Sequence, residues 1–415
     1  MKVLVSCYAC SPYKGSEPGV GWNMAVALAQ YNEVWVVTRE KNRSSIEKYI
    51  AQHPVSNLHF CYHDSNIGVK TIKRVSDFLY YQLWNISFCA KAKVIVEQNK
   101  IDIIHHVTFN QYRSIAFGYF INKPLLVGPI GGAELIDEAF DKELTFVTRC
   151  RETWRRKLWD AVLLRWLLKR TKMPKMVLFS AKENLIRLQQ YISPFAEARV
   201  LPAIGVSTWD FPDNMPTDSA TSVFTMLYAG RIVDWKGLHL FMHSVSIVKD
   251  QLPSWKVILA GINSAKEVGQ VTEWCKKYNI ENQVELISWM PREQLLRKLT
   301  EINLFVYSAF RDSGSMAILE ACAMGCPALC FDAGGQDAFP DDCVIKVPIV
   351  HKDYERTLAN FSEKILWASQ SKSGLQQYGN RARQYVMDNM TWQRKGMIIN
   401  EIYRNLTSKI RNTEM

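Results

Sequence analysis

The sequence contains no long apolar run. No stretch approaches the ~20 apolar residues that a bilayer-spanning helix needs. The opening residues, MKVLVSCYACSPYKG, lack the apolar core of a secretory signal peptide and lead directly into an expected strand. The ten cysteines are scattered over 415 residues, which is not the pattern of a disulfide framework. We therefore expect a protein of the reducing cytoplasm.

Motifs for metal and redox chemistry are also missing. Cys7 and Cys10 form a C-x-x-C pair, and Cys322, Cys326 and Cys330 recur every four residues, but neither set has a second ligand pair. Small buried hydrophobic side chains are the better interpretation of these cysteines. No cluster of carboxylates has the pattern of a metal site, so we expect neither a metal ion nor a cofactor.

Acidic residues are fewer than basic ones, 40 against 51, which gives a formal net charge of +11. Such an excess suits nucleic acid, an anionic membrane face or a phosphorylated substrate. The chain has no recognisable nucleic-acid-binding motif, so we expect no nucleic-acid partner.

The basic excess is concentrated in residues 149–175, where ten basic residues accompany two acidic ones and three tryptophans. Cationic and aromatic side chains together suit an anionic membrane surface. A helix that packs on its domain and has a charged rim explains the same composition. Both interpretations stay open.

Length indicates two or three domains, and the composition, 48% hydrophobic and 22% charged, is that of a folded protein. Short apolar runs alternate with longer helix-like stretches. Their near-continuous apolar character predicts strands buried on both faces, as in parallel sheets with right-handed crossovers. The expected strands are 2–8, 33–38, 58–62, 101–107, 124–130, 176–180, 199–203, 224–229, 256–261, 284–288, 303–308, 327–332 and 343–347.

A polar stretch at 209–222, rich in Pro, Asp, Ser and Thr, separates the two series of strands and has the composition of a linker. We predict an α/β protein with two doubly wound, Rossmann-like domains, residues 1–208 and 223–390, facing a cleft. Ligands of such sheets bind beyond the carboxyl ends of the strands, so the chemistry is expected in that cleft. Residues 391–415 have helical composition and are expected to cross back to the first domain.

The first polar loop of the second domain follows the strand 224–229. Gly230 permits a sharp turn, and Arg231 and Lys236 stand between the strand end and a helix expected to begin near Gly237. Two cations close to a helix N-terminus suit a diphosphate. A solvated basic pair is the alternative.

The second polar loop follows the strand 303–308 and opens a helix. Its small residues expose backbone N–H groups that can hold phosphate or sugar oxygens; they are Ser313, Gly314, Ser315, Met316 and Ala317. Glu320 lies further along the same helix among small apolar residues. A buried carboxylate needs hydrogen-bond donors, and ribose hydroxyls would supply two.

These loops together resemble a known family. The pattern A-G-R-x-x-x-x-K-G, followed by an acid, seven residues and a Glu before A-x-A-x-G-x-P, is similar to that of retaining glycosyltransferases of family four, which have the GT-B architecture. The resemblance implies that Arg231 and Lys236 bind the donor diphosphate and that Glu320 holds the ribose. It also implies that Asp312, where the family has Glu, lies near the transferred sugar.

The first domain lacks the dinucleotide motif G-x-G-x-x-G, so NAD binding is unsupported. Its loop Gly15-Ser16-Glu17-Pro18-Gly19 still allows a ligand to approach the backbone closely, although a plain flexible loop is the alternative. The loop resembles that of a subgroup acting in bacterial surface polysaccharide assembly. The resemblance implies that Gly15 and Gly19 lie near the donor phosphates and Glu17 near the acceptor.

His105 and His106 end the strand 101–107 and are followed by Thr108. Successive strand residues face opposite ways, so one histidine is expected to reach the cleft, and a structural role is the alternative. The family often shows H-x-H at this place, with the second His near the reacting centre. The resemblance implies a catalytic role for His105 or His106 and an acceptor contact for Thr108.

Glu134 follows a G-P-x-G-G turn at 128–132 that resembles the turn of the same subgroup. It is a candidate acceptor ligand, and a rigid structural turn is the alternative.

The resemblance implies a metal-independent hexosyltransferase that moves a sugar, with retention of configuration, from a nucleotide-diphosphate sugar to a glycan or lipid-linked glycan. Residues 1–208 would bind the acceptor and residues 223–390 the donor. The expected context is lipopolysaccharide, capsule or exopolysaccharide synthesis, with the protein peripheral on the inner face of the cytoplasmic membrane. The alternatives are a nucleotide-sugar epimerase or a phosphorylase of the same fold and, on charge alone, a basic nucleic-acid-binding protein.

Overall fold

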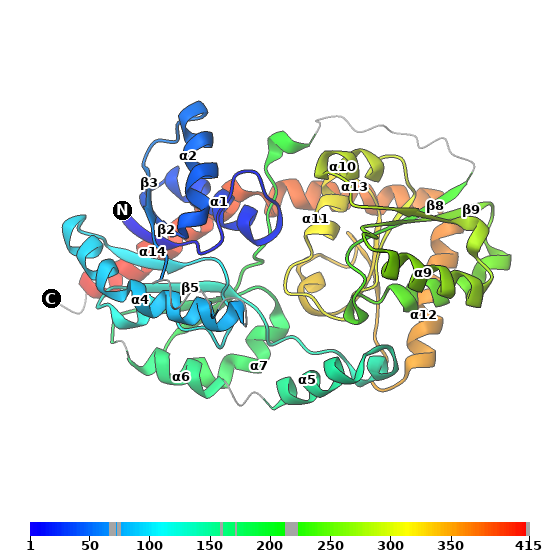
Figure 1. Ribbon diagram of the computed structural model, residues 1–415, viewed down its shortest axis with the longest axis horizontal. Coiled ribbons are helices and arrows are strands. Elements are labelled where there is room, and N and C mark those ends of the chain that lie inside the picture. The colour runs from blue at the N-terminus through cyan, green and yellow to red at the C-terminus, as the bar shows by residue number, and fades with distance from the viewer. Residues whose placement is uncertain (66–71, 73–75, 158–160, 171, 212–222, 412–415) are drawn as a thin grey trace. The chain divides into compact units, whose positions relative to one another are not determined.

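The chain forms two α/β units. The computed structural model describes residues 1–65, 72, 76–157, 161–170, 172–211 and 223–411. Unit 1 comprises residues 1–133, 158–205 and 392–415, and unit 2 comprises residues 134–157 and 206–391. Each unit contains one parallel sheet with helices packed around it (Figure 1). The predicted α/β fold with two Rossmann-like domains is therefore confirmed.

Unit 1 has a seven-stranded parallel sheet with the order β3-β2-β1-β4-β5-β6-β7. Its strands are β1 (Lys2–Ser6), β2 (Glu33–Thr38), β3 (Leu58–Tyr62), β4 (Ile103–His106), β5 (Leu125–Ile130), β6 (Lys175–Phe179) and β7 (Glu197–Val200). Its helices are α1 (Ser16–Ala29), α2 (Arg43–Gln52), α4 (Asp77–Gln98), α6 (Ala161–Arg170), α7 (Lys182–Ile192) and α14 (Trp392–Arg411). The strand order reverses between β1 and β4, so the loops after these two strands flank the position where doubly wound sheets bind ligands.

Unit 2 has a six-stranded parallel sheet with the order β10-β9-β8-β11-β12-β13. Its strands are β8 (Phe224–Ala229), β9 (Trp255–Ala260), β10 (Val284–Ile287), β11 (Leu304–Tyr307), β12 (Ala328–Phe331) and β13 (Ile345–Val347). Its helices are α5 (Phe146–Arg156), α8 (Leu238–Val248), α9 (Ala265–Tyr278), α10 (Arg292–Leu299), α11 (Met316–Ala323), α12 (Tyr354–Gln370) and α13 (Lys372–Asn389). The order reverses between β8 and β11, and the two polar loops identified in the sequence follow these two strands.

Every strand expected from the sequence is present, each within a few residues of its predicted range. The apolar runs predicted strands correctly because the central strands are buried on both faces. In β1, for example, Val3, Leu4 and Val5 are all 0% exposed although they alternate in direction.

Residues 134–157 differ from the predicted domain division, which placed them in the first domain. Their contacts place them in unit 2. Ile136, Phe140 and Leu144 are buried in the hydrophobic core of unit 2, on and around the short helix η4 (Glu138–Glu143). Chain order suggested the wrong domain because apolar residues of a connecting segment do not reveal which sheet will bury them. Of the predicted linker 209–222, residues 212–222 lie outside the described part of the chain.

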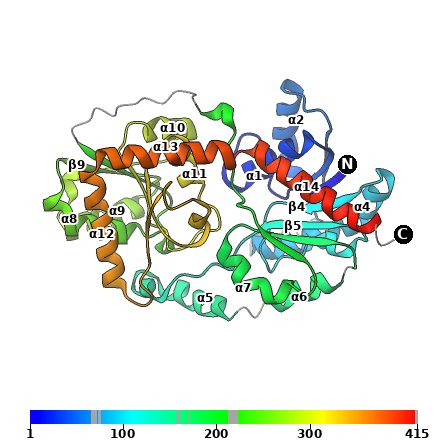
Figure 2. The ribbon, with the colours of Figure 1, turned by 180° about the vertical axis from the view of Figure 1, so that it is seen from behind.

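The last helix, α14, packs in unit 1 beside α1 (Figure 2). Trp392, Ile399, Tyr403 and Leu406 are buried in a core of unit 1, at spacings that place them on one face of the helix. The C-terminal segment that was expected to return to the first domain therefore contributes a continuous apolar stripe to that unit.

Lys395 lies on the buried face of α14. Its side chain is 1% exposed, its Nζ donates a hydrogen bond to the carbonyl of Pro202 at 2.6 Å, and burial lowers its pKa to about 7. The unfolded chain, in which the lysine pKa is about 10.4, therefore binds a proton between these two values that the folded chain does not hold. By linkage, this group makes the free energy of unfolding rise with pH across that window and costs most stability below about pH 7.

We predict that Lys395→Met stabilises the protein, by on the order of 2–4 kcal/mol near neutral pH, because an apolar side chain removes the cost of the buried charge. The stabilisation should shrink as pH rises toward the lysine value of about 10.4. Denaturant unfolding of both proteins over this pH range measures the difference. A difference that does not change with pH would show that the charge of Lys395 is not its source.

No helix among the described residues combines the length and apolar character needed to cross a membrane.

Candidate functional site

The loop after β8, residues 230–237, is held in a tight form. It contains the short helix η6 (Asp234–Lys236) and ends at Gly237, whose φ is +65°. A Cβ at Gly237 would lie 2.0 Å from the carbonyl oxygen of Ser308, so only glycine fits. Helix α8 begins directly afterwards, as predicted, and Arg231 and Lys236 therefore stand between a strand end and a helix N-terminus.

The loop after β11, residues 308–315, is bonded to the first loop. The N–H of Phe310 donates to the carbonyl of Trp235 at 2.9 Å, and the hydroxyl of Ser308 donates to the carbonyl of Lys236 at 3.2 Å. Asp312 is fixed within its loop by the N–H of Gly314, which donates to its carboxylate at 3.1 Å. The two loops predicted to bind the donor thus form one rigid structure at the strand-order reversal of the second sheet.

The ammonium group of Lys236 joins the two loops through its side chain. It lies 2.5 Å from the carboxylate of Asp312 and 2.6 Å from the hydroxyl of Tyr307, which itself donates to Asp312. Burial and the neighbouring carboxylate of Asp312 raise the pKa of Tyr307 well above its ordinary value, so the phenol remains a proton donor. The three side chains form a fixed, charged cluster, which we call the Lys236 cluster.

Arg231 differs from Lys236 in its surroundings. Its side chain is exposed, and among the described residues no hydrogen bond or ion pair engages its guanidinium group. The cation is therefore available to an anionic ligand. Gly230 precedes it at the end of β8, and the backbone of Ser313 to Ala317 leads into the first turn of α11.

Glu320 is 7% exposed on α11, which agrees with the expected burial of this carboxylate. Its protein partner is Arg292, whose Nε lies 2.5 Å away and whose other nitrogen lies 3.1 Å from Asp210. Burial raises the pKa of Glu320, and the cation of Arg292 opposes this shift. No protein partner for Glu320 was expected from the sequence; the structure supplies one at the first residue of α10.

The comparisons with known proteins agree with this site. Residues 216–385 match the protein family described as Glycosyl transferases group 1. The chain carries a group 1 glycosyltransferase domain. That match covers the whole donor-loop region, including Arg231, Lys236, Asp312 and Glu320.

A curated relative of this glycosyltransferase domain is one subunit of the phosphatidylinositol N-acetylglucosaminyltransferase of Arabidopsis thaliana, which is 24% identical over 167 residues. The match covers 40% of this chain and 36% of the relative, so the chain spans about a third of that protein's length.

Solved structures resemble the chain over nearly its full length. Sucrose-phosphate synthase from Thermosynechococcus elongatus superposes with a TM-score of 0.66 at 16% identity, covering 98% of this chain and 99% of the other. HepE from Anabaena in complex with UDP-glucose superposes with a TM-score of 0.57 at 15% identity, covering 99% and 100%. At these identities the likeness shows the fold, which is the GT-B fold of two Rossmann-like domains.

Residues predicted to act in the first domain lie around the strand-order reversal of unit 1. The N–H of Ala9, after β1, donates to the hydroxyl of Thr108, after β4, at 3.1 Å. Glu17, at the start of α1, accepts from the N–H of Phe109 at 2.5 Å. Gly15 and Gly19 belong to the same loop and first helical turn. The structure thus brings these residues together, and their proposed contacts with donor and acceptor stay predictions.

Both predicted histidines are completely buried in unit 1. His105 contacts the hydroxyl of Tyr403 at 2.6 Å and the carbonyl of Gly128 at 2.9 Å, and His106 accepts from the N–H of Gly118 at 3.2 Å. Burial lowers the pKa of His105 to about 4 and that of His106 to about 3, so both are neutral at physiological pH. The expectation that one ring reaches an open site has no support in this geometry, and the catalytic role stays an untested prediction.

Glu134 is 2% exposed and belongs to unit 2. Its negative charge acts on Arg311, and its carbonyl accepts from Arg155 at 2.8 Å. The acceptor contact proposed for Glu134 stays a prediction.

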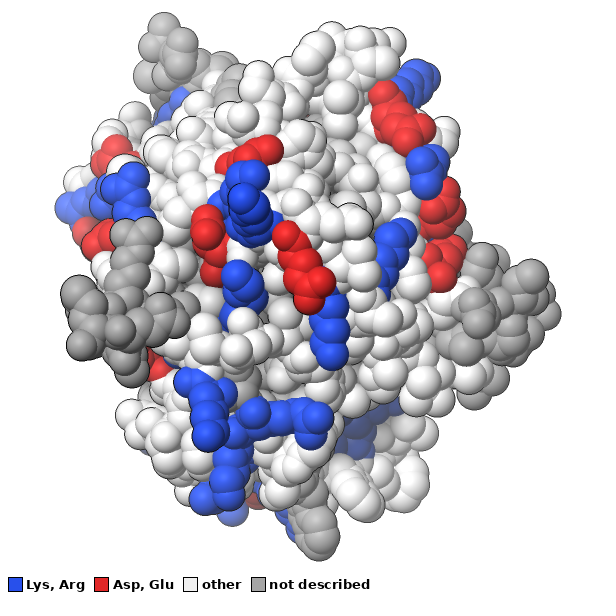
Figure 3. Space-filling view, turned by 90° about the vertical axis from the view of Figure 1, so that its left-hand side faces the viewer, with Lys and Arg blue, Asp and Glu red and all other residues white. Residues whose placement is uncertain are grey.

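The basic stretch 149–175 is divided between the two units. Residues 149–157 belong to α5 and its end in unit 2, and residues 161–170 form α6 in unit 1. On α6 the exposed side chains are Val162, Arg165, Trp166, Lys169 and Arg170. Figure 3 shows basic side chains gathered at the lower end of this face, at the level of α6 in Figure 1, with little acidic surface among them.

The sequence reasoning missed two residues that contact the predicted ones, Tyr307 and Arg292. Each had a usable signal: Tyr307 is the last residue of a predicted strand at a carboxyl edge, and Arg292 directly follows the Trp289-Met290-Pro291 turn that resembles the family pattern. Their side-chain partners, however, depend on tertiary contacts.

Proposed function

We propose that the protein is a retaining, metal-independent glycosyltransferase that moves a sugar from a nucleotide-diphosphate sugar to a glycan or lipid-linked glycan. The observation that carries this proposal is the Lys236 cluster, fixed at the strand-order reversal of unit 2 in the loop that also presents the exposed Arg231. Two cations near the N-termini of α8 and α11 match the charge of a diphosphate.

In the proposed reaction the bond between the anomeric carbon and the diphosphate breaks, and negative charge develops on the leaving diphosphate. Arg231 and Lys236 stabilise that charge electrostatically, the role a metal ion has in other transferases. Glu320 accepts hydrogen bonds from the ribose hydroxyls, and Asp312 lies at the transferred sugar. The acceptor hydroxyl attacks on the face from which the diphosphate leaves, so configuration is retained without a protein nucleophile.

The bacterial context and the acceptor class follow from the loops 15–19 and 128–132, which resemble those of the polysaccharide-assembly subgroup. An anionic membrane surface on the cytoplasmic side is the proposed location of the acceptor. The exposed Val162 and Trp166 among the cations of α6 support this, because apolar and cationic side chains together suit the headgroup region. Sedimentation with anionic and with neutral vesicles tests the location.

A thermal-shift screen with UDP, GDP, ADP and the corresponding nucleotide sugars tests the donor site. We expect one base to raise the melting temperature, because a ligand that binds only the folded state stabilises it. The nucleotide sugar of that base is then incubated with the protein and a glycan acceptor. Release of nucleoside diphosphate supports the transferase, whereas conversion to an epimeric nucleotide sugar without release would identify an epimerase.

A further inference from the structure

Residues 134–157 contact both donor loops directly. The buried Glu152 of α5 lies 2.6 Å from Arg311, the residue immediately before Asp312. Phe140 stacks on Phe310 of the same loop, with ring centroids 3.9 Å apart. The segment therefore packs against the loop that carries Asp312 through one ion pair and one aromatic contact.

The same segment holds the other donor loop through Asp234, which lies between Arg231 and Lys236. One carboxylate oxygen of Asp234 accepts from both the N–H and the hydroxyl of Thr145, each at 2.9 Å. Partial burial acts to raise the pKa of Asp234, but these hydrogen bonds and that of Trp235 lower it overall, so the carboxylate is ionised.

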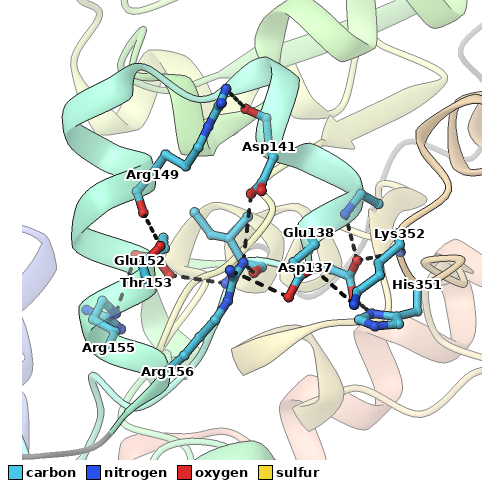
Figure 4. Close-up of polar contacts among 12 residues, drawn as sticks. Asp137, Glu138, Asp141, Arg149, Glu152, Thr153, Arg155, Arg156, His351 and Lys352 are labelled. Atoms are coloured by element: carbon cyan, nitrogen blue, oxygen red, sulfur yellow. Dashed lines mark hydrogen bonds and ion pairs between the residues drawn. The ribbon is translucent and has the colours of Figure 1, made fainter.

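The segment is itself firmly anchored to unit 2, as Figure 4 shows. Asp137 lies 2.7 Å from His351 and accepts from the N–H of Lys352 at 3.1 Å. Arg156 lies between Glu138, at 3.6 Å, and Asp141, at 3.8 Å, and so ties α5 to η4. Anchors of this kind make the segment a rigid support rather than a loose connection.

A pocket of about 790 Å³ completes this arrangement. Its walls are the centre of the first donor loop, residues 232–235, together with Thr145 and Thr148 of the segment and parts of α8 and α9. The donor loop is therefore not packed along its whole length, and the hydrogen bonds from Thr145 are specific contacts that hold it beside this open space.

We propose that segment 134–157 positions the two donor loops for phosphate binding, with Glu152 and Thr145 as the positioning residues. Glu152 fixes Arg311 and hence the backbone that carries Asp312, while Thr145 fixes Asp234 and hence the cations on either side of it. The inference rests on the proposed donor site, and it assigns a role in donor binding to residues that the chain order places between β5 and α6 of the other unit.

Glu152→Gln tests the proposal with Asp137→Asn as its matched control. Both changes replace a carboxylate of the segment by an amide of the same shape, but only Glu152 contacts a donor loop. We expect Glu152→Gln to weaken calorimetric binding of the nucleoside diphosphate selected from UDP, GDP and ADP by about tenfold, since mispositioned groups lose charge-assisted hydrogen bonds. Asp137→Asn should bind within about twofold of the wild type.

Hydrogen exchange of the ligand-free proteins separates this inference from the proposed function. Amides of residues 231–237 and 309–316 should exchange faster in Glu152→Gln and at the wild-type rate in Asp137→Asn. Unchanged exchange and affinity in Glu152→Gln, or equal effects of both variants, would overturn the positioning role. If the wild type binds none of the three nucleotides while the exchange difference appears, the proposed function fails and the loop support stands.

Thr145 provides the second pair of variants should Glu152→Gln not fold. Thr145→Val removes the hydroxyl that donates to Asp234, and Thr145→Ser keeps it. Faster exchange of residues 231–237 with weaker nucleotide binding in Thr145→Val, and recovery of both in Thr145→Ser, would support the proposal. Identical behaviour of the two variants would contradict it.

Discussion

Lys236→Ala is expected to lower turnover about 100- to 1000-fold, the loss typical of removing one preorganised donor to a developing negative charge. In the structure the ammonium group is already held by Asp312 and Tyr307, so it needs no reorganisation when the diphosphate leaves. The acceptor KM should change much less than kcat, because the charge that Lys236 meets develops on the donor. Release of nucleoside diphosphate from the nucleotide sugar measures the rate.

Lys298→Ala is the control for this experiment. Lys298 is a lysine of the same unit that forms an exposed ion pair with Glu301 at 2.9 Å on the end of α10. Its loss is expected to leave turnover within about twofold of the wild type, since exposed pairs contribute little. Unchanged turnover in Lys236→Ala would remove the central residue of the proposed donor site.

Glu320→Ala is expected to weaken binding of a nucleoside diphosphate by about 10- to 100-fold, because hydrogen bonds to a charged group contribute about 1.5–3 kcal/mol. The carboxylate is 7% exposed and is fixed by Arg292, so it is presented to the ribose at little conformational cost. Glu320→Gln retains the shape and one acceptor oxygen and should fall between the wild type and the alanine variant. Calorimetric titration gives the three affinities.

Pyrophosphate distinguishes a ribose contact from a general effect of Glu320 on the fold. It shares the diphosphate but has no ribose, so its affinity should be unchanged in Glu320→Ala and strongly reduced in Lys236→Ala. Equal losses for pyrophosphate and nucleoside diphosphate in Glu320→Ala would mean that the residue supports the helix through Arg292 and does not bind the ribose.

The donor residues could be predicted because their information is local. Arg231 and Lys236 lie five residues apart after one strand, and Asp312 and Glu320 lie eight apart across one helix start, so chain geometry alone places each pair at a carboxyl edge. The order of strands then brings the two edges together, because β8 and β11 are neighbours in the parallel sheet.

The histidines show where a local pattern misleads. Two histidines at a strand end predict a side chain that reaches the ligand site, yet His105 meets Tyr403 from α14, almost three hundred residues later. A buried ring with protein partners cannot be distinguished in the sequence from an exposed one, because the partner lies on a helix that returns from the far end of the chain.

By itself, the sequence determined the two parallel sheets, the position of each strand and the pairs of residues that face a diphosphate, because buried strands and loop spacings are written in neighbouring residues. Only the tertiary structure decided that Arg292 pairs with Glu320, that Tyr307 completes the Lys236 cluster and that residues 134–157 belong to unit 2. Each of these depends on which distant surface buries a given side chain. That choice is a property of packing and cannot be read from the residue's own neighbours.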